Sequence, residues 1–309
     1  MRKVAIIDMG TNTFNLLIAA VNGDGSYSIV HSGKLPVKLG EGGINKKFII
    51  PSAYQRGLNA VGEHYRTILL HGATEVFAFA TSATRNATNG EAFVNDIKNL
   101  FGVDVKVIDG NEEAELVYLG VRQAVTLNEH KVLVLDIGGG SNEIIIGNSN
   151  SYFWKKSYDL GISRLLQQFN PSDPISPSQV KEVEAFLEVE LSDMVEPIEE
   201  HKPKMIIGSS GSFDTYRSVL MHANKIKANG NPSVEIPLDE YFMLHNHLLT
   251  TTKEQRAAIP GMDFMRVEMI VLATIFTNFL IKKFNLKTMM QSSYALKEGA
   301  VWRMVNSKG

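Results

Sequence analysis

The sequence contains no cysteine. Disulfide bonds, thiolate nucleophiles and zinc–thiolate sites are therefore excluded, and a cytoplasmic location is expected because such a composition suits a reducing compartment. A clear excess of either charge is also lacking, since 31 Lys and Arg residues stand against 33 Asp and Glu residues, for a formal net charge of −2. A broadly basic nucleic-acid-binding surface is thus excluded, and an anionic ligand would need a locally positive cleft.

Long hydrophobic runs are missing as well. The longest run, MIVLATIFTNFLI at 269–281, is too short to cross about 30 Å of hydrocarbon and contains Thr and Asn. It predicts a buried helix rather than a membrane span. The first residues, MRKVAIIDMG, meet Asp8 after a short apolar run, so no signal peptide is expected.

What the sequence does have is the composition of an ordinary globular protein, with 44% hydrophobic and 21% charged residues. Its 309 residues are about twice the length of a typical domain, so we expect two domains. Hydrophobic periodicity predicts strands in the first half at 3–8, 13–21, 27–39, 74–80 and 103–109, and helices at 52–70, 91–101 and 111–126. Ser52 and Gln55 have capping-box spacing at the start of the first helix.

The second half repeats this alternation. Strands are predicted at 131–136, 143–148, 152–158 and 204–207, and Ser176 followed by Pro177 should open a helix that runs to about 196. A strand and a last helix are expected within 286–305, and the polar stretch 225–233 should be a surface loop. The predicted fold class is therefore α/β, with two related halves and an interdomain cleft.

Two segments share one pattern at a separation of 128 residues. In each, an apolar strand ends in an aspartate (Asp8 or Asp136), and a glycine-containing turn and a returning strand follow. The pattern predicts a β-hairpin whose turn glycines adopt positive φ and let an anion approach the backbone. A purely structural Asp-Gly turn would explain either copy alone. The two copies together favour an internally duplicated fold with a phosphate site between the halves.

Glu143 lies among isoleucines in the returning strand of the second hairpin. A buried carboxylate without a partner costs several kcal/mol, and a hydrated divalent cation shared with Asp136 and Asp8 would supply that partner. Mg²⁺ suits such a site because it binds one or two carboxylates and completes its shell with water and substrate phosphate. The alternative is that Glu143 lies on a solvated face.

Glu112 and Glu113 belong to the segment DGNEEAELVYLG at 109–120, just after a predicted strand. Acids in the first turn of a helix are stabilised by the helix dipole, which is sufficient reason for both. Their position beside a cleft also makes one of them a candidate general base that activates a water.

Other segments are weaker candidates for anion binding. Arg85 follows a strand end, where ligands collect in open α/β sheets, and could clamp a phosphate; the alternative is a surface arginine beside a capped helix start. Lys38 is either a phosphate contact or part of a plain loop. GSSGSFD at 208–214 predicts a helix N-terminus able to bind an anion, although it lacks the lysine of a Walker A loop. His245 and His247 are interpreted as helix-surface residues rather than a metal site.

Six segments occur in the order seen in a known family: DMGTNTFNLLIA, KLGEGG, ATSATRNATN, GNEEAELVYLGV, VLDIGGGSNEIIIG and GSSGSFD. On these segments the chain resembles the exopolyphosphatase / guanosine pentaphosphate phosphatase family (Ppx/GppA) over nearly its whole length. The resemblance implies duplicated ribonuclease-H-like domains of the actin, sugar-kinase and Hsp70 superfamily. We therefore place the first domain at 1–124 together with a C-terminal helix at about 293–309, and the second domain at 125–292.

The resemblance also implies a phosphoanhydride hydrolase that uses Mg²⁺ and releases terminal orthophosphate from inorganic polyphosphate or pppGpp. Matched position by position, it assigns the catalytic base to Glu113 and the metal-associated acids to Asp136 and Glu143. Its phosphate-contacting residues fall on Asn12, Thr13, Arg85, Gly138, Gly139, Gly140 and Ser141. The expected partners are the polyphosphate or guanosine polyphosphate substrate and a second copy of the chain in a homodimer, with no nucleic acid and no membrane.

The sequence departs from the family in two segments. RVEMI at 266–270 and SSYALKEG at 292–299 stand where relatives often show R-A-D and D-x-G-L-R-E-G, which leaves the choice of substrate open. Longer relatives continue into a further helical region, so short polyphosphates or a single nucleotide polyphosphate are expected here, with Lys38, Arg85, Arg164 and Arg266 as candidate positive lining. Two other functions are alternatives, namely an ATP-dependent small-molecule kinase of the same superfamily and a non-catalytic (p)ppGpp sensor.

Overall fold

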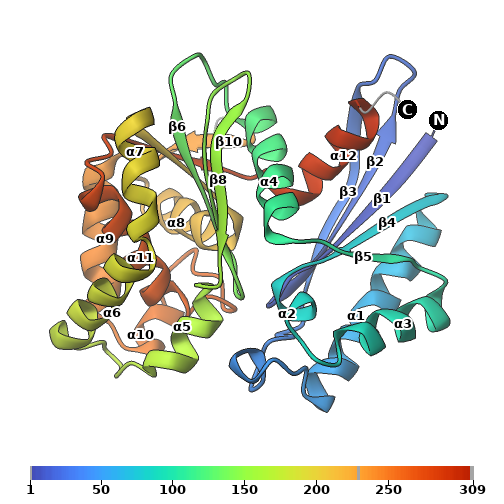
Figure 1. The fold of residues 1–309 in the computed structure, drawn as a ribbon, viewed down its shortest axis with the longest axis horizontal. Helices are drawn as coiled ribbons and strands as arrows, with labels where there is room; N and C mark the ends of the chain where they lie inside the picture. Colours follow the sequence, from blue (N-terminus) through green and yellow to red (C-terminus); the bar gives the residue numbers. More distant parts are fainter. Residues whose placement is uncertain (1, 228–229, 307–309) are drawn as a thin grey trace.

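Two mixed β-sheets organise the chain in the computed structural model, which describes residues 2–227 and 230–306 (Figure 1). The first sheet has the order β3-β2-β1-β4-β5 and is built from β1 (Arg2–Met9), β2 (Thr13–Val21), β3 (Tyr27–Pro36), β4 (Glu75–Ala80) and β5 (Val105–Val107). The second sheet has the order β10-β11-β9-β6-β7-β8 and is built from β6 (Val132–Ile137), β7 (Asn142–Gly147), β8 (Tyr152–Tyr158), β9 (Met205–Ser209), β10 (Ser233–Glu235) and β11 (Thr288–Ser292).

The two sheets repeat one arrangement of strands. β1 pairs antiparallel with β2 and parallel with β4, and β6 pairs antiparallel with β7 and parallel with β9. The central strands β1 and β6 are buried along most of their length because their apolar residues face helices or the other sheet. The predicted duplication is therefore present in the sheet topology.

Helices cover both sheets. Those of the first half are η1 (Ile44–Lys46), α1 (Pro51–Leu70), α2 (Ser82–Arg85), α3 (Gly90–Phe101) and α4 (Gly110–Ala124). Those of the second half are α5 (Ile162–Phe169), α6 (Pro177–Glu190), η2 (Ser192–Met194), α7 (Val195–His201), α8 (Ser210–His222), α9 (Leu238–Thr250), α10 (Lys253–Ala257), α11 (Ile270–Lys283) and α12 (Leu296–Asn306). None of the described helices is long and apolar enough to span a bilayer.

α4 and α12 pack against each other between the two sheets (Figure 1). One apolar cluster joins Val4 of the first sheet, Val134 of the second, and residues of both helices. The helices approach each other backbone to backbone, because a Cβ added at Gly299 would lie only 1.8 Å from the carbonyl oxygen of Leu116. β1 to β5 form one sheet and β6 to β11 the other, and α12 returns to pack on β1 and β2. The predicted domain boundaries stay a prediction.

The structure corrects three predictions about helices. α1 begins at Pro51, with Ile50 as its N-cap, so the predicted capping box of Ser52 and Gln55 is wrong. The helix starts one residue earlier than predicted because proline is favoured at the first helical position. The helix that opens at Pro177 ends at Glu190, and η2 and α7 follow it. Pro197, which lies in the first turn of α7, cannot continue a longer helix because it lacks an N–H donor.

His245 is the third correction, because its side chain is buried in α9 rather than exposed. Its Nδ1 lies 3.1 Å from the hydroxyl of Thr274 on α11, and burial lowers its pKa to about 4. It is therefore a neutral core histidine, whereas His247 is exposed as expected. Part of the predicted loop at 225–233 lies outside the described residues, and its last residue, Ser233, begins β10.

Candidate active site

The two predicted hairpin turns have the same local geometry. In the first, the N–H of Gly10 donates to the carbonyl of Thr13 over 3.1 Å, and in the second, Gly138 donates to Ser141 over the same 3.1 Å. Strand pairing then sets Asp8 opposite Asn15, and Asp136 opposite Glu143. Each central strand therefore carries an aspartate one residue before its end, opposite a polar residue of the returning strand.

A cavity of about 130 Å³ lies between these turns. Ten of the predicted site residues line it, and these are Asp8, Asn12, Thr13, Glu113, Asp136, Gly138, Gly139, Gly140, Ser141 and Glu143. Arg85 lies behind Glu113, and Lys38 is exposed on a loop, outside the lining found among the described residues. Residues from both halves of the sequence thus meet at one site.

The glycines of the second turn serve close approach between the halves. A Cβ added at Gly139 would lie 2.4 Å from Nδ2 of Asn12, and one at Gly140 would lie 2.5 Å from the hydroxyl of Thr11. The glycines with positive φ lie elsewhere in the described chain, so the predicted positive φ of the glycines is wrong for both hairpin turns. Gly139 and Gly140 therefore leave room for the first hairpin, whereas a Cβ at Gly138 would lie 2.5 Å from the carbonyl oxygen of Ser141 in its own turn.

Glu113 is buried at the start of α4, with 7% of its surface exposed. Nη1 of Arg85 donates to its Oε2 over 2.9 Å, and the same nitrogen donates to the carbonyl of Ile108. Burial raises the pKa of Glu113 to about 7, against the opposing charge and hydrogen bond of Arg85 and with the support of the charges of Asp8 and Asp136. A carboxylate with such a pKa can take up a proton near neutral pH.

Glu112 points away from the cavity, although it adjoins Glu113 in sequence. The side chain of Asp109 caps α4 by accepting the N–H of Glu112 over 2.8 Å, and this fixes the rotation of the helix. The carboxylate of Glu112 then pairs with Lys106 and Arg303. The structure separates the two acids that sequence reasoning left together.

Asp136 and Glu143 concentrate negative charge at the second hairpin. Glu143 is 2% exposed, so the alternative of a solvated face is wrong. Its Oε1 accepts the hydroxyl of Ser157 over 2.7 Å, and Oδ2 of Asp136 accepts the hydroxyl of Ser209 over 3.1 Å. Burial raises the pKa of both carboxyls, and the charges of Glu113 and Asp136 raise that of Glu143 further.

Asp8 is the acid of the first hairpin and has an amide as its neighbour. Nδ2 of Asn15 donates to its Oδ2 over 2.9 Å. Burial raises the pKa of Asp8 to about 6, and the hydrogen bond from Asn15 opposes this rise. The first hairpin therefore carries one carboxylate where the second carries two.

The donor set of the cavity consists of hard oxygen ligands. Asp8, Asp136 and Glu143 are carboxylates whose raised pKa values reflect burial without enough positive charge, which a bound cation would offset. Among residues 2–227 and 230–306, no group of three or more His, Asp or Glu side chains is arranged so that it could hold a metal ion. The residues fit a Mg²⁺ ion held by one or two carboxylates, with water and phosphate as its other ligands.

Three cationic side chains line the cavity, namely Lys34 from β3, Arg266 before α11 and Lys297 in the first turn of α12. Arg266 is 7% exposed, and its Nε has no hydrogen-bond partner among the described residues. Burial acts to lower the pKa of Lys297, but the charges of Glu298, Asp8 and Asp214 raise it, so this lysine stays protonated. These cations are the groups of the lining that can pair with an anionic ligand.

Sequence reasoning missed Lys34 and Lys297. Lys34 neighbours Asn15 across the β2–β3 pair, and a register for those strands would have pointed to it. Lys297 follows the end of β11 at the same edge of the second sheet, where Asp136 lies. Arg266 was among the candidates and lines the cavity, whereas Arg164 is buried behind the second turn and donates to the carbonyl of Gly140 over 2.7 Å.

The GSSGSFD segment also reaches the cavity. Ser210, Gly211 and Asp214 at the N-terminus of α8 line it, as the segment's interpretation as an anion-binding helix start requires. A Cβ at Gly211 would lie 2.2 Å from the guanidinium of Arg266, so the glycine lets this guanidinium pack against the start of α8.

Comparison with known proteins places this chain in a family. The model of the Ppx/GppA phosphatase family matches residues 17–308. Exopolyphosphatase 1 of Mycobacterium leprae is 26% identical over 309 residues, covering 99% of this chain and 90% of the relative. A putative exopolyphosphatase of Haemophilus influenzae is 26% identical over 304 residues, covering 98% of this chain and 92% of the relative.

Solved structures agree. The crystal structure of an exopolyphosphatase from Cytophaga hutchinsonii is 35% identical, has a TM-score of 0.95, and the match covers 100% of this chain and 99% of that one. A Ppx/GppA family member from Aquifex aeolicus is 25% identical with a TM-score of 0.81, covering 98% and 97% of the two chains. The predicted α/β fold of duplicated ribonuclease-H-like domains is confirmed, and the chain is a phosphatase that belongs to the Ppx/GppA family.

Proposed function

We propose that this phosphatase hydrolyses the terminal phosphoanhydride bond of inorganic polyphosphate and releases orthophosphate. The observation that carries the proposal is the buried carboxylate of Glu113, which lies at the cavity between two glycine-containing turns and has a pKa of about 7. The names of the relatives from Mycobacterium leprae and Cytophaga hutchinsonii support polyphosphate as the substrate.

Glu113 is the proposed general base. Arg85 holds one of its carboxylate oxygens at 2.9 Å, which fixes the direction of the other oxygen. Glu113 takes a proton from a water as the water oxygen attacks the terminal phosphorus. The bond from that phosphorus to the bridging oxygen breaks, and the shortened polyphosphate leaves with the electron pair.

The turns and the cations are the proposed phosphate-binding groups. Hydroxyl and amide groups of Thr11, Asn12 and Thr13 face Gly138–Ser141 across the cavity, and Lys34, Arg266 and Lys297 add positive charge. Such preorganised donors stabilise charge on phosphoryl oxygens as it develops in the transition state. Arg85, expected earlier to contact phosphate, is better placed to orient Glu113.

We propose Mg²⁺ as the cofactor, held by Asp136 and Glu143 with Asp8 nearby. Their oxygen donors and raised pKa values support this choice. A bound Mg²⁺ ion would neutralise charge on the substrate's phosphoryl oxygens. Ser157 and Ser209 orient the two carboxylates through their hydroxyl donors.

The lining of the cavity favours inorganic polyphosphate over a nucleotide. Every aromatic side chain of the described residues lies outside the lining, and the lining residues are mostly polar or charged. A guanine base gains much of its binding energy from stacking, which this lining does not offer. We propose pppGpp as a second and weaker substrate, because it carries the same terminal anhydride.

The two alternative functions have less support. A small-molecule kinase would need an acceptor site, for which the cavity supplies no separate set of residues among those described. A non-catalytic (p)ppGpp sensor has no use for a buried base such as Glu113. Family membership and the position of Glu113 both support hydrolysis.

The test is orthophosphate release with Mg²⁺ from long-chain polyphosphate, tripolyphosphate, pppGpp and ATP at equal concentrations of terminal phosphate. We expect the inorganic chains to give the highest kcat/KM and ATP the lowest. Consumption of ATP alone, with its terminal phosphate transferred to a small molecule and no orthophosphate released, would support the kinase and contradict the proposal.

A further inference from the structure

An ion pair joins the two halves of the molecule at the cavity. Nζ of Lys34 on β3 lies 2.7 Å from Oδ2 of Asp263, which belongs to the segment before α11. The Lys34 side chain is 53% exposed and that of Asp263 is 18% exposed. A cation that lines the cavity is therefore already neutralised by a carboxylate from the opposite half.

Asp263 is held in its ionised form. Burial acts to raise its pKa, but the hydrogen bonds from Lys34 and the N–H of Met265 and the charges of Lys34 and Arg266 lower it below its usual value. Its backbone carbonyl also accepts the N–H of Arg266 over 2.8 Å. Asp263 thus lies beside two of the three cations that would attract a phosphate.

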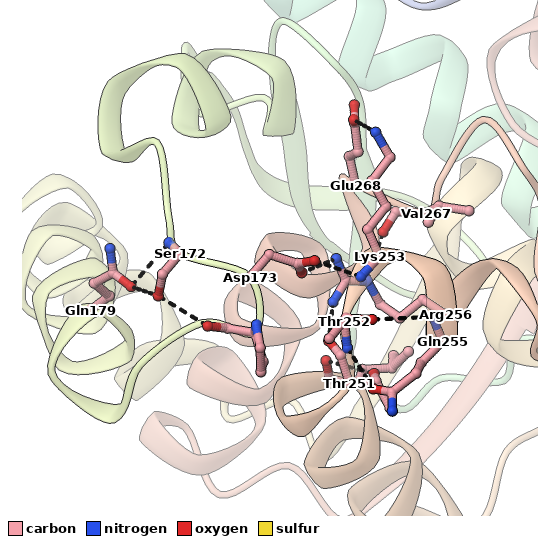
Figure 2. A network of polar contacts seen from close by, with 12 residues as sticks. Ser172, Asp173, Gln179, Thr251, Thr252, Lys253, Gln255, Arg256, Val267 and Glu268 are labelled. Carbon is pink, nitrogen blue, oxygen red and sulfur yellow. Dashed lines mark hydrogen bonds and ion pairs between the residues drawn. The ribbon is translucent and has the colours of Figure 1, made fainter.

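The segment that carries Asp263 is anchored without Lys34. Arg256 is buried behind it, where Nε donates to the carbonyl of Val267 over 2.9 Å and Nη2 pairs with Asp173 at 2.7 Å. Lys253 pairs with Glu268 on the same segment, and Figure 2 shows this network around Arg256. Lys34 can therefore exchange its partner while Asp263 keeps its place.

We propose that Asp263 is an internal competitor of the substrate, and that Lys34 exchanges Asp263 for a phosphate group of a polyphosphate chain when that chain enters the cavity. The proposal rests on the function proposed above, because it needs a ligand with phosphates both at the reacting position and at Lys34. Asp263 then weakens substrate binding and keeps Lys34 neutralised when the substrate is absent.

The direction in which Asp263→Asn changes polyphosphate affinity distinguishes competition for Lys34 from a merely structural role of the ion pair. If Asp263 competes for Lys34, Asp263→Asn should strengthen polyphosphate binding, whereas loss of a merely structural contact would weaken it. A partly exposed ion pair contributes little, so we expect the dissociation constant to fall by about two- to fivefold. Lys34→Gln should raise the dissociation constant because it removes the proposed phosphate contact.

The experiment measures binding of a methylene-bridged tripolyphosphate analogue by calorimetry, with Mg²⁺ and the full chain. Four proteins form a double-mutant cycle: the unaltered chain, Asp263→Asn, Lys34→Gln and the double variant. Glu268→Gln is the matched control, because it removes the same charge from the same segment, but its partner Lys253 lies outside the cavity lining. We expect the gain from Asp263→Asn to shrink below about 1.5-fold when Lys34 is already Gln.

An unchanged or weaker affinity in Asp263→Asn would overturn the proposal. An equal gain in both Lys34 backgrounds, or an equal gain in Glu268→Gln, would also overturn it, because the effect would then be a general change of charge. The measurement needs no turnover. The affinities of the four proteins could match the double-mutant cycle while the unaltered chain releases no orthophosphate. That result would contradict the proposed function and still support the exchange at Lys34.

Discussion

The two hairpins of this phosphatase have the same backbone and different chemistry. Each has a central strand, an aspartate at its end and a glycine turn closed by a 3.1 Å hydrogen bond. In the first hairpin the residue opposite the aspartate is Asn15, and in the second it is Glu143. The duplicated fold therefore gives the two hairpins the same backbone. The residue opposite the aspartate, Asn15 or Glu143, determines whether the hairpin carries one carboxylate or two.

This difference suggests a division of labour across the cavity. The first hairpin offers hydroxyl and amide groups and one carboxylate, as expected of a surface that holds phosphate oxygens. The second hairpin adds Asp136 and Glu143 to its phosphate-binding turn, as expected of a surface that also holds a cation. Glu113 belongs to neither hairpin and enters from α4, which packs between the two sheets.

The largest expected effect comes from replacing Glu113, the acid that belongs to neither hairpin. Glu113→Gln should lower kcat by at least about 10²-fold while leaving the dissociation constant of a non-hydrolysable polyphosphate within about threefold, because it removes the base and keeps the shape. The control is Glu112→Gln, whose carboxylate pairs with Lys106 and Arg303 outside the cavity. Equal losses in both variants would show that Glu113 has no special role.

Glu143→Gln makes the second hairpin chemically similar to the first. We expect kcat/KM to fall by about tenfold or more and the Mg²⁺ concentration for half-maximal activity to rise, since one proposed ligand is lost. Titration of activity with Mg²⁺ measures both. An unchanged Mg²⁺ requirement would show that the carboxylate pair is not the metal site.

Asn15→Asp is the reverse exchange and gives the first hairpin a second carboxylate. It should not create a second productive site, because phosphate oxygens and not a cation are expected there. We expect lower affinity for polyphosphate through charge repulsion and a lower Tm, because the new carboxylate would lie beside the buried Asp8. Higher activity in this variant would contradict the division between the hairpins.

The residues of the two hairpins could be predicted from the sequence, but the side chains that other segments bring to the hairpins could not. Asp8, Asp136 and Glu143 could be predicted because strand periodicity and a glycine turn define their places locally. Lys34 and Lys297 could not, because each reaches the cavity through a strand order that local patterns do not encode. The roles of Arg85 and of the turn glycines also depend on contacts between distant segments, namely with Glu113 and with Thr11 and Asn12.

Glu113 should give the activity a pH dependence near neutrality. A base acts when deprotonated, so kcat/KM should fall as the pH drops through about 7. The positive charge of Arg85 lowers the pKa of Glu113, so Arg85→Met should move the midpoint upward. A profile that shifts downward in this variant, measured at saturating Mg²⁺, would contradict the role given to Arg85.

The smallest expected effect is on stability. The pKa of Glu113 is raised from 4.5 to about 7 on folding, so the folded state binds the proton more tightly than the unfolded state. Stability is therefore lost as the pH rises from the unfolded pKa to the folded one, and the loss is complete above about 7. Glu113→Gln should accordingly raise Tm by about 2–4 °C at pH 8 and by less at pH 5, as thermal unfolding at both pH values would show.

The central claim is that Glu113 activates a water that attacks the terminal phosphorus directly. It is tested most directly by a single turnover of polyphosphate in water enriched in ¹⁸O, with Mg²⁺ present, followed by mass analysis of the orthophosphate and of the shortened chain. The account predicts one ¹⁸O atom in each released orthophosphate and none in the chain, at a rate at least about 10²-fold lower in Glu113→Gln. Label in the shortened chain, or orthophosphate without label, would contradict it.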